Sequence, residues 1–293
     1  MAEPVVMLCI GAQKAGTTWL HRTLESHPEC HLRSVKEIHY FDTLHQGRED
    51  YYRRTRAVEQ QTLRRKLRWK LPWQGRKQRR RLRDLREVHA LWPTDDGHHR
   101  AYAAYLMGGR RKERVVADIS PSYMTLDRAL FEQMGTVADD VRFVLLLRDP
   151  LDRAWSQARM NASRQKKTDA KATPERAFDR YLNGKNPISE RLADYEHALT
   201  HLTATVPEER RFIAFYEELF CDETLFRLYD FLGISRISGF YDTVAHGGNP
   251  HKLDPRRRGR ALAKLRPQYD FCDRFFEGRL PERWRARMEE MAA

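Results

Sequence analysis

A short glycine-bearing loop near the start of the chain carries the residues best suited to binding an anion. It runs from Gly11 to Gly16, follows an apolar stretch and precedes an apolar helical pattern. Glycines let a backbone approach a phosphate closely, and the N–H groups and dipole of a helix N-terminus favour negative charge. The spacing therefore predicts a phosphate-binding turn between a strand and a helix.

The position of its lysine separates this loop from that of nucleoside triphosphatases. Those loops read G-x-x-x-x-G-K-[ST], whereas Thr17 follows the second glycine here and Lys14 lies inside the loop. The string GAQKAGTTWL resembles the 5′-phosphosulfate loop of sulfotransferases that use 3′-phosphoadenosine-5′-phosphosulfate (PAPS). The resemblance implies donor contacts from Gly11, Gln13, Lys14, Ala15, Gly16, Thr17, Thr18 and Trp19.

A second anion site is predicted where the strongest apolar run of the chain ends, at Arg148. Ligands of open α/β sheets bind beyond the carboxyl ends of the strands, and an arginine fork suits a phosphate. The string RDPLDRAWSQ resembles the 3′-phosphate-binding segment of the same sulfotransferases, which implies that Arg148 and Ser156 hold the donor's 3′-phosphate. Some relatives close over the adenosine with a basic C-terminal loop, for which Lys252 and Arg257 are the candidates here.

The string KEIHYFD, from Lys36 to Asp42, supplies two candidate bases. It is similar to the segment that carries the catalytic glutamate in the heparan-sulfate-type branch of the sulfotransferases, which implies Glu37 as the base. His39 is the alternative, because a neutral imidazole titrates near working pH and a histidine has this role in the cytosolic small-molecule branch. Two structural interpretations stay open: a salt bridge from Glu37 to Lys36 or to an arginine of the basic stretch described below, and a packed His39 that orients Glu37 or Asp42.

Sulfuryl transfer by in-line displacement to a hydroxyl or amine follows from these assignments. Such a reaction needs positioning and charge stabilisation more than covalent chemistry. Lys14 would stabilise the leaving phosphate, Lys36 would hold sulfuryl oxygens, and Glu37 would take the acceptor's proton. The nucleotide product would be 3′-phosphoadenosine-5′-phosphate (PAP), and no metal is required, because lysines supply the positive charge. The resemblance implies acceptor contacts from Tyr40, Phe41, Ser120, Pro121 and Tyr123.

The elements that must position these residues alternate along the chain. Strands are predicted at 5–10, 114–118, 141–147 and 211–216, and helices from Thr17, from Pro150, over 189–203 and over 217–232. This alternation favours an α/β fold with a P-loop-type, mostly parallel sheet and helices on both faces. We expect residues 1–293 to form a single sulfotransferase domain.

A basic stretch interrupts this alternation, and we expect an inserted helical or loop segment over residues 53–100. From Arg53 to Arg86, fifteen Lys or Arg accompany only two acids, with Trp69 and Trp73 among them. One interpretation is a solvated basic face. The other is a lid that faces the acceptor, or a peripheral contact with an anionic membrane or polysaccharide.

Net charge, cysteine and histidine spacing and the length of apolar runs indicate which partners and which location to expect. The net charge of +13 suits anionic partners, and neither the four cysteines nor the twelve histidines have metal-site spacing. Apolar runs are too short to span a membrane and a secretory signal is not apparent, so we expect a cytoplasmic bacterial enzyme. The expected acceptor is a small molecule, a glycan or a lipid headgroup, and no nucleic acid partner is expected.

Two other functions compete with this interpretation. A P-loop nucleotide or metabolite kinase would need a lysine where Thr17 stands, and a carboxylate to hold Mg²⁺. A non-enzymatic polyanion-binding protein would rest on the basic stretch and would not need Lys14.

Overall fold

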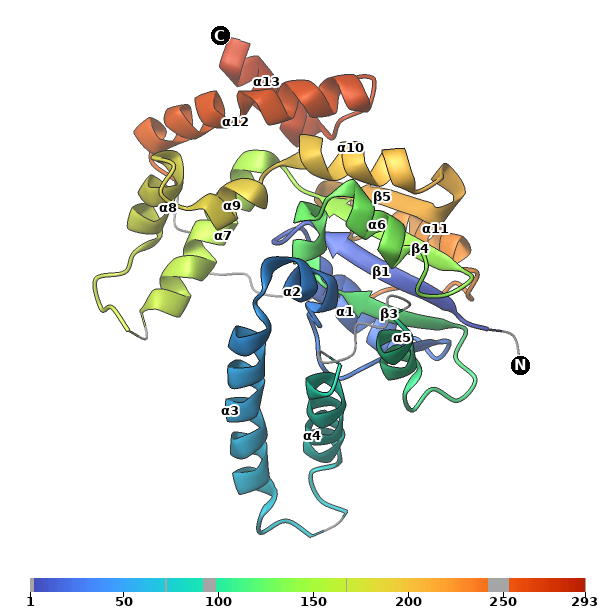
Figure 1. The fold of residues 1–293 in the computed structure, drawn as a ribbon. Helices are drawn as coiled ribbons and strands as arrows, with labels where there is room; N and C mark the ends of the chain where they lie inside the picture. Colours follow the sequence, from blue (N-terminus) through green and yellow to red (C-terminus); the bar gives the residue numbers. More distant parts are fainter. Residues whose placement is uncertain (1–2, 72, 92–98, 167, 242–252, 293) are drawn as a thin grey trace.

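Five parallel strands form the central sheet of the computed structural model, which describes residues 3–71, 73–91, 99–166, 168–241 and 253–292 (Figure 1). The spatial order is β2-β3-β1-β4-β5. The strands are β1 (Val5–Gly11), β2 (Cys30–Leu32), β3 (Val115–Ile119), β4 (Val141–Leu147) and β5 (Arg211–Phe215). The predicted α/β class and parallel sheet are confirmed, and β2, only three residues long, is the strand that the sequence did not indicate.

The sheet order brings distant parts of the sequence to one edge. β1 pairs with β3 on one side and with β4 on the other, both in parallel. The carboxyl ends of the three strands therefore lie next to one another, and so do the segments that leave them: the glycine loop, the Ser120 segment and Arg148. Strands buried on both faces need continuous apolar sequence, which explains the runs of apolar residues in β1 and β4.

Helices flank the sheet, and several of their boundaries differ from expectation. The helices outside the basic stretch are α1 (Thr17–Ser26), α2 (Tyr40–Gln46), α5 (Arg100–Met107), α6 (Arg128–Met134), α7 (Pro150–Gln165), α8 (Pro174–Leu182), α9 (Pro187–Arg191), α10 (Tyr195–Thr205), α11 (Asp222–Leu232), α12 (Pro255–Phe275) and α13 (Glu282–Ala292). The single helix predicted over 189–203 is wrong, because Asp194 accepts a hydrogen bond from the His197 N–H and starts α10 separately from α9. The helix predicted from Glu217 begins later, because residues 216–218 form a 3₁₀ turn.

The C-terminal helices complete the core. Trp284 of α13 is fully buried and packs against the rings of Tyr195, Phe215 and Tyr269. Aromatic residues bury large areas and fix the orientation of the elements that carry them. The basic end of the chain is therefore a structural part of the fold.

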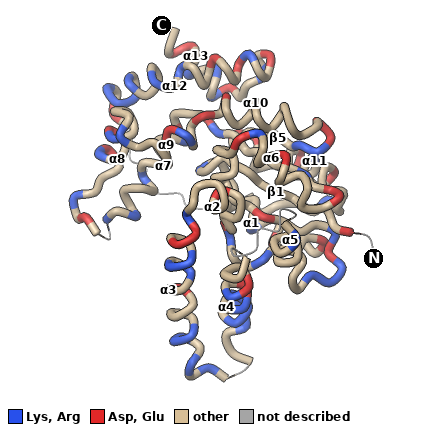
Figure 2. The backbone as a smooth tube through the Cα atoms, in the orientation of Figure 1, with Lys and Arg blue, Asp and Glu red and all other residues tan. Residues whose placement is uncertain are grey.

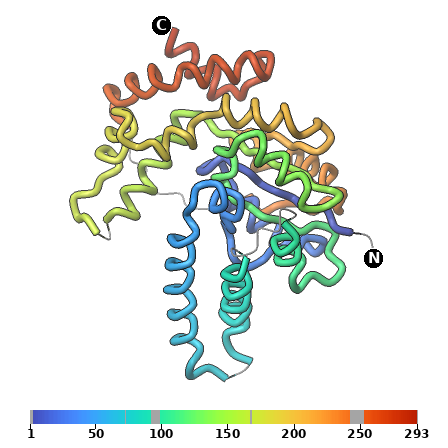
Figure 3. Tube along the Cα trace, viewed as in Figure 1, coloured from blue at the N-terminus to red at the C-terminus, as the bar shows by residue number. Residues whose placement is uncertain are grey.

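The basic stretch forms a helical hairpin, made of α3 (Glu49–Leu67) and α4 (Arg76–His89), which begins four residues before its predicted start. The two helices run side by side away from the body of the protein, and the chain turns back at their far end (Figures 1 and 3). Lys and Arg are spread along both helices (Figure 2). Within the described ranges, no helix is both long enough and apolar enough to cross a bilayer.

The end of the hairpin nearest the body is tied to residues 32–38 by its own charged side chains. The buried Asp84 accepts hydrogen bonds from the Ser34 N–H and hydroxyl. Arg56, also buried, donates to the Ile38 carbonyl at 2.5 Å, and Arg81 donates to the Ser34 carbonyl. This part of the basic stretch is therefore not a freely solvated face, because it braces the segment that contains Glu37 and His39.

Candidate active site

The glycine loop joins β1 to α1 in a backbone conformation that only glycine adopts easily. Gly16 has φ +91°, and a Cβ built on it would lie 2.7 Å from Leu219 Cδ2. A side chain at this position would meet both backbone strain and a clash. Lys14 also has a positive φ, of 74°, although it carries a side chain. Strain of this kind persists where the surroundings enforce it, and it is common at functional sites.

Arg148 fixes the loop from the neighbouring strand. Its Nη1 donates to the Lys14 carbonyl at 2.9 Å, and its guanidinium lies 4.3 Å from the centre of the Tyr216 ring. The structure thus brings the two predicted anion sites together, since Arg148 touches the loop that carries Lys14.

Positive charge accumulates around this loop. Burial lowers the pKa of Lys14, and the nearby charges of Arg148, Arg159 and Arg164 lower it further. Burial likewise lowers the pKa of Lys36. The buried Nε atom of Arg148 has no hydrogen-bond partner among the described residues. A cluster of cations with an unsatisfied guanidinium fits a ligand that carries several negative charges.

A second strained turn presents the two candidate bases. Glu37 and His39 have φ values of 57° and 55°, both in the left-handed region. His39 Nδ1 lies 2.8 Å from Asp42 Oδ2, and its Nε2 lies 3.6 Å from Glu37 Oε2. The imidazole also stacks on the Tyr52 ring, with 4.6 Å between centroids. His39 is therefore held between two carboxylates.

These contacts set the protonation of both groups. Burial would lower the pKa of His39, but the hydrogen bond to Asp42 and the interaction with Glu37 prevail and raise it to about 9. Burial would raise the pKa of Glu37, but the interactions with His39 and Lys36 prevail and hold it below its ordinary value. Near neutral pH the site therefore pairs an ionised Glu37 with a protonated His39.

Lys36 connects this turn to the glycine loop. Its Nζ donates to Thr18 Oγ1 at 2.6 Å and lies 3.8 Å from Glu37 Oε1. The salt bridge left open by the sequence is thus present, and it is long. The loop, the ammonium of Lys36 and the carboxylate of Glu37 form one continuous polar surface.

A buried carboxylate behind the turn holds its backbone. Asp118, at the end of β3, accepts hydrogen bonds from the hydroxyls of Ser120 at 2.8 Å, Tyr123 at 2.8 Å and Tyr102 at 2.7 Å. Two of these hydroxyls also accept hydrogen bonds from the backbone of the turn. Ser120 Oγ accepts from the His39 N–H at 3.3 Å, and Tyr123 Oη accepts from the Tyr40 N–H at 2.9 Å.

The residues predicted to contact the acceptor lie in or beside this network, and that predicted role stays a prediction. Tyr40, Phe41, Ser120, Pro121 and Tyr123 are all buried, and none of them lines the cavity described next. Their rings and hydroxyls support the turn from inside the core. The Ser120 segment does reach the cavity, but through Ser122 and Thr125.

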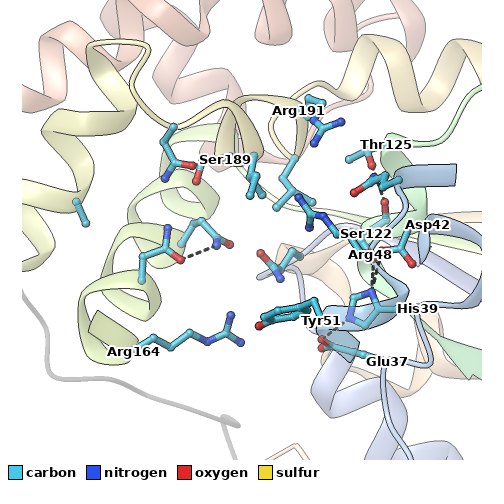
Figure 4. Close-up of a pocket in the computed structure, with 18 of the residues that line it drawn as sticks. Glu37, His39, Asp42, Arg48, Tyr51, Ser122, Thr125, Arg164, Ser189 and Arg191 are labelled. Atoms are coloured by element: carbon cyan, nitrogen blue, oxygen red, sulfur yellow. Dashed lines mark hydrogen bonds and ion pairs between the residues drawn. The ribbon is translucent and has the colours of Figure 1, made fainter. Parts of the chain in front are cut away.

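A cavity of about 830 Å³ opens beside Glu37 and His39. Gln13 of the glycine loop lines it, as do Arg48, Tyr51 and Tyr52 at the start of α3. Figure 4 shows Arg164 reaching in from α7 on the opposite side, with Ser189 and Arg191 of the α9 segment above. The cavity therefore joins the glycine loop to a space large enough for a second molecule.

The other residues predicted to bind the donor lie in different surroundings. Ser156 is buried on α7, and Trp19 is buried against Phe220, 5.2 Å between centroids, which is a packing position. The guanidinium of Arg257 forms salt bridges with Asp179 and Asp254, each with an N–O distance of 2.7 Å. Its role as a donor contact stays a prediction, and Lys252 lies outside the described residues.

Sequence reasoning missed the arginines of the cavity wall. Arg48, Arg164, Arg180 and Arg191 line it, and none has a carboxylate within 4.0 Å in the parts of the chain that are described. Arg164 could have been found, because it follows Ser156 by eight residues and therefore lies on the same face of α7. The others come from elements that the sequence does not place near the loop.

Within the described ranges, no three His, Cys, Asp or Glu side chains are grouped as metal ligands would be.

Comparisons with known proteins match this architecture. A family model described as the sulfotransferase family covers residues 5–238. The fold is similar to the crystal structure of a sulfotransferase from Alicyclobacillus acidocaldarius, with TM-score 0.63 and 19% identity, over 97% of this chain and 100% of that one. The sulfotransferase domain of the Synechococcus PCC 7002 olefin synthase (TM-score 0.42, 19% identity, 88% and 87% covered) is more distant. So is the sulfotransferase domain from the curacin biosynthetic pathway (0.43, 14%, 90% and 98%). No curated protein matches the chain.

The pKa of His39 gives a first test of the charge arrangement. Because its folded-state pKa of about 9 exceeds the ordinary 6.5, its stabilising contribution is complete below pH 6.5 and is lost as the pH rises through 9. We expect NMR titration to show this pKa, and Asp42→Asn to lower it. When the unfolding free energy is measured with urea, it should fall less between pH 6 and pH 10 in His39→Gln than in the wild type. An imidazole that titrates below 7 in the wild type would contradict the arrangement.

The support from Asp118 can be tested with a matched pair of tyrosines. Tyr123→Phe should leave the buried Tyr40 N–H unpaired, cost about 1–3 kcal/mol in unfolding free energy and lower the pKa of His39 by loosening the turn. Tyr102→Phe removes a hydrogen bond to the same carboxylate but touches no backbone group of the turn, so the pKa of His39 should stay near that of the wild type. Equal NMR titrations in the two variants would show that the hydroxyl of Tyr123 does not position the turn.

Proposed function

This chain belongs to the sulfotransferase family, and on that premise we propose that it transfers a sulfuryl group from PAPS to a hydroxyl or amine. The observation that carries the proposal is the contact made by Lys36, which joins the glycine loop at Thr18 to the carboxylate of Glu37. A donor held by the loop and an acceptor in the cavity would meet at this point. The donor supplies the sulfuryl group already activated as a phosphosulfate.

The glycine loop binds phosphate in this mechanism. The N-terminal N–H groups of α1, the hydroxyl of Thr17 and the ammonium of Lys14 hold the 5′-phosphate. Arg148 and Ser156 serve the 3′-phosphate, and the unsatisfied Nε of Arg148 supports that role. Lys14 neutralises the charge that grows on the departing oxygen, which is worth most where water is excluded.

Glu37 acts as the general base, and His39 positions it. A group must be unprotonated to accept a proton. His39 is protonated near neutral pH because its pKa is raised to about 9, whereas the pKa of Glu37 is lowered. The imidazolium therefore orients the carboxylate of Glu37, and Lys36 holds sulfuryl oxygens beside it.

Donor binding is the direct test of the proposed function. Calorimetry should show PAP binding more tightly than ATP–Mg²⁺, and Lys14→Ala should weaken PAP binding while the protein stays folded. Preference for ATP–Mg²⁺ would support a kinase instead. Binding of neither nucleotide would leave only the polyanion-binding alternative and would refute the proposal.

Single-turnover kinetics distinguish the two bases, with radiolabelled donor and an acceptor found by screening metabolites. Glu37→Gln should slow transfer by about 10²–10⁴-fold, because Asp42, the other carboxylate that lines the cavity, is held by His39. His39→Gln should slow it less, since the carboxylate remains. PAP affinity should be unchanged in both, as a control for folding. A near-normal rate in Glu37→Gln would assign the base to His39.

We further infer that the acceptor carries negative charge. Arg48, Arg164, Arg180 and Arg191 line the cavity, while its two acids, Glu37 and Asp42, are both engaged with His39. An acceptor with a carboxylate, sulfate or phosphate group would balance these guanidinium groups. This surface favours an acidic small molecule, glycan or headgroup over a neutral one.

Two arginines of α8 provide a matched test of this inference. Arg180 lines the cavity and Arg176, one turn earlier, does not. Arg180→Gln should raise KM for an acidic acceptor roughly three- to tenfold, with little change for its neutral methyl ester. Arg176→Gln should leave both values unchanged. If the two variants behave alike, acceptor charge is not recognised by this wall.

A further inference from the structure

We propose that the far end of the α3–α4 hairpin inserts into the interface of an anionic lipid bilayer. We call residues 64–71 and 73–77 the hairpin tip. Its cations, its exposed apolar side chains and its place at the end of a projecting arm each support this contact. The proposal does not depend on the reaction proposed above.

Residues 53–86, which make up most of the hairpin, account for the formal net charge of the protein. The chain has 54 Lys and Arg and 41 Asp and Glu, of which 15 and 2 fall within residues 53–86, so that 39 of each remain elsewhere. The rest of the chain is therefore neutral overall, and the hairpin as a whole, with Glu49, Asp50 and Glu87 included, keeps +10 of the +13 (Figure 2). A field concentrated in this way attracts a negative surface to the hairpin first.

The cations of the tip differ from those near the body. Arg56 and Arg81 donate hydrogen bonds to the segment that contains the turn of Glu37 and His39. At the tip, seven cations are exposed and have no carboxylate within 4.0 Å among the residues that the structure describes: Arg64, Arg65, Lys66, Arg68, Lys70, Arg76 and Lys77. The first group is explained by its hydrogen bonds to the body of the protein. The second group has no carboxylate partner among the described residues.

Apolar side chains occupy the same end of the hairpin. Trp69 is 85% exposed, Trp73 66% and Leu71 50%. Tryptophan and leucine among lysines and arginines are typical of segments that lie in a membrane interface, where the rings enter the headgroup region and the cations meet anionic lipids. A nucleic acid or an acidic polysaccharide would satisfy the cations but would leave Leu71 in water. The combination therefore favours lipid.

The geometry keeps this contact clear of the cavity. α3 has 19 residues, so its length is about 28 Å at 1.5 Å per residue. Its first turn carries Tyr51 at the cavity wall, and its last turn leads into the tip. A bilayer at the tip would leave the cavity open.

Vesicle co-sedimentation of the full chain tests the proposal. We expect binding to vesicles of phosphatidylcholine with 30% phosphatidylglycerol, and little binding to phosphatidylcholine alone. W69S/L71S/W73S should weaken binding at least about tenfold and abolish the blue shift of tryptophan fluorescence. Phe240→Ser, which replaces an aromatic residue 72% exposed on another part of the chain, is the apolar control and should bind like the wild type.

Charge is tested separately. R64E/K66E should weaken binding at least about tenfold, since each cation near an anionic surface contributes about 1 kcal/mol. R266E/R285E alters two exposed arginines of α12 and α13 by the same charge and should have little effect. Melting curves and PAP affinity confirm that each variant is folded.

Three outcomes would overturn the proposal. Full vesicle binding by W69S/L71S/W73S would indicate a purely electrostatic surface. Equal losses in R64E/K66E and R266E/R285E would show that the hairpin is not the contact. Binding to heparin or duplex DNA at concentrations where anionic vesicles do not bind would assign the tip to a polyanion.

Discussion

The hydrogen bonds to the buried carboxylate of Asp118 determine where the reactive side chains lie. Ser120 and Tyr123 each donate to Asp118 and accept from a backbone N–H of the turn that carries Glu37 and His39. A left-handed conformation at two residues with side chains is unfavourable, so such a turn needs partners on its backbone. The hydroxyls of Ser120 and Tyr123 are these partners, and Asp118, in the strand β3, holds both hydroxyls in place.

The protonation of each titratable group near the glycine loop and the turn depends on the charges of its neighbours. Around the glycine loop, burial lowers the pKa of Lys14, and the nearby charges of Arg148 and Arg159 lower it further. Around His39, two carboxylates raise the pKa of the imidazole. Lys36 lies between these two regions. In the proposed reaction, a negatively charged donor would be attracted to the first region and the second would keep Glu37 ionised, so that one narrow surface would provide both binding and proton transfer.

The sequence predicted what depends on local pattern. The apolar runs of β1 and β4 and the loop from Gly11 to Gly16 fall where they were expected. The left-handed turn at Glu37 and His39 was not predicted. Residue type alone did not reveal which face of a segment meets the cavity, and for this reason Tyr40 and Tyr123 were assigned to the acceptor although they are buried. Arg48 and Arg191 were missed for another reason: only the packing of α3 and α9 around the sheet brings them to the cavity, and nothing in their own neighbourhood signals it.

The hydrogen bond from Arg148 to the Lys14 carbonyl spans 134 residues of sequence. Contacts of such large separation form late, because a long stretch of chain must be ordered before they can close. During synthesis, the glycine loop leaves the ribosome well before β4 has been made. The nascent N-terminal half therefore carries a loop without its bracing arginine, and the proposed nucleotide site would be complete only when β4 docks beside β1.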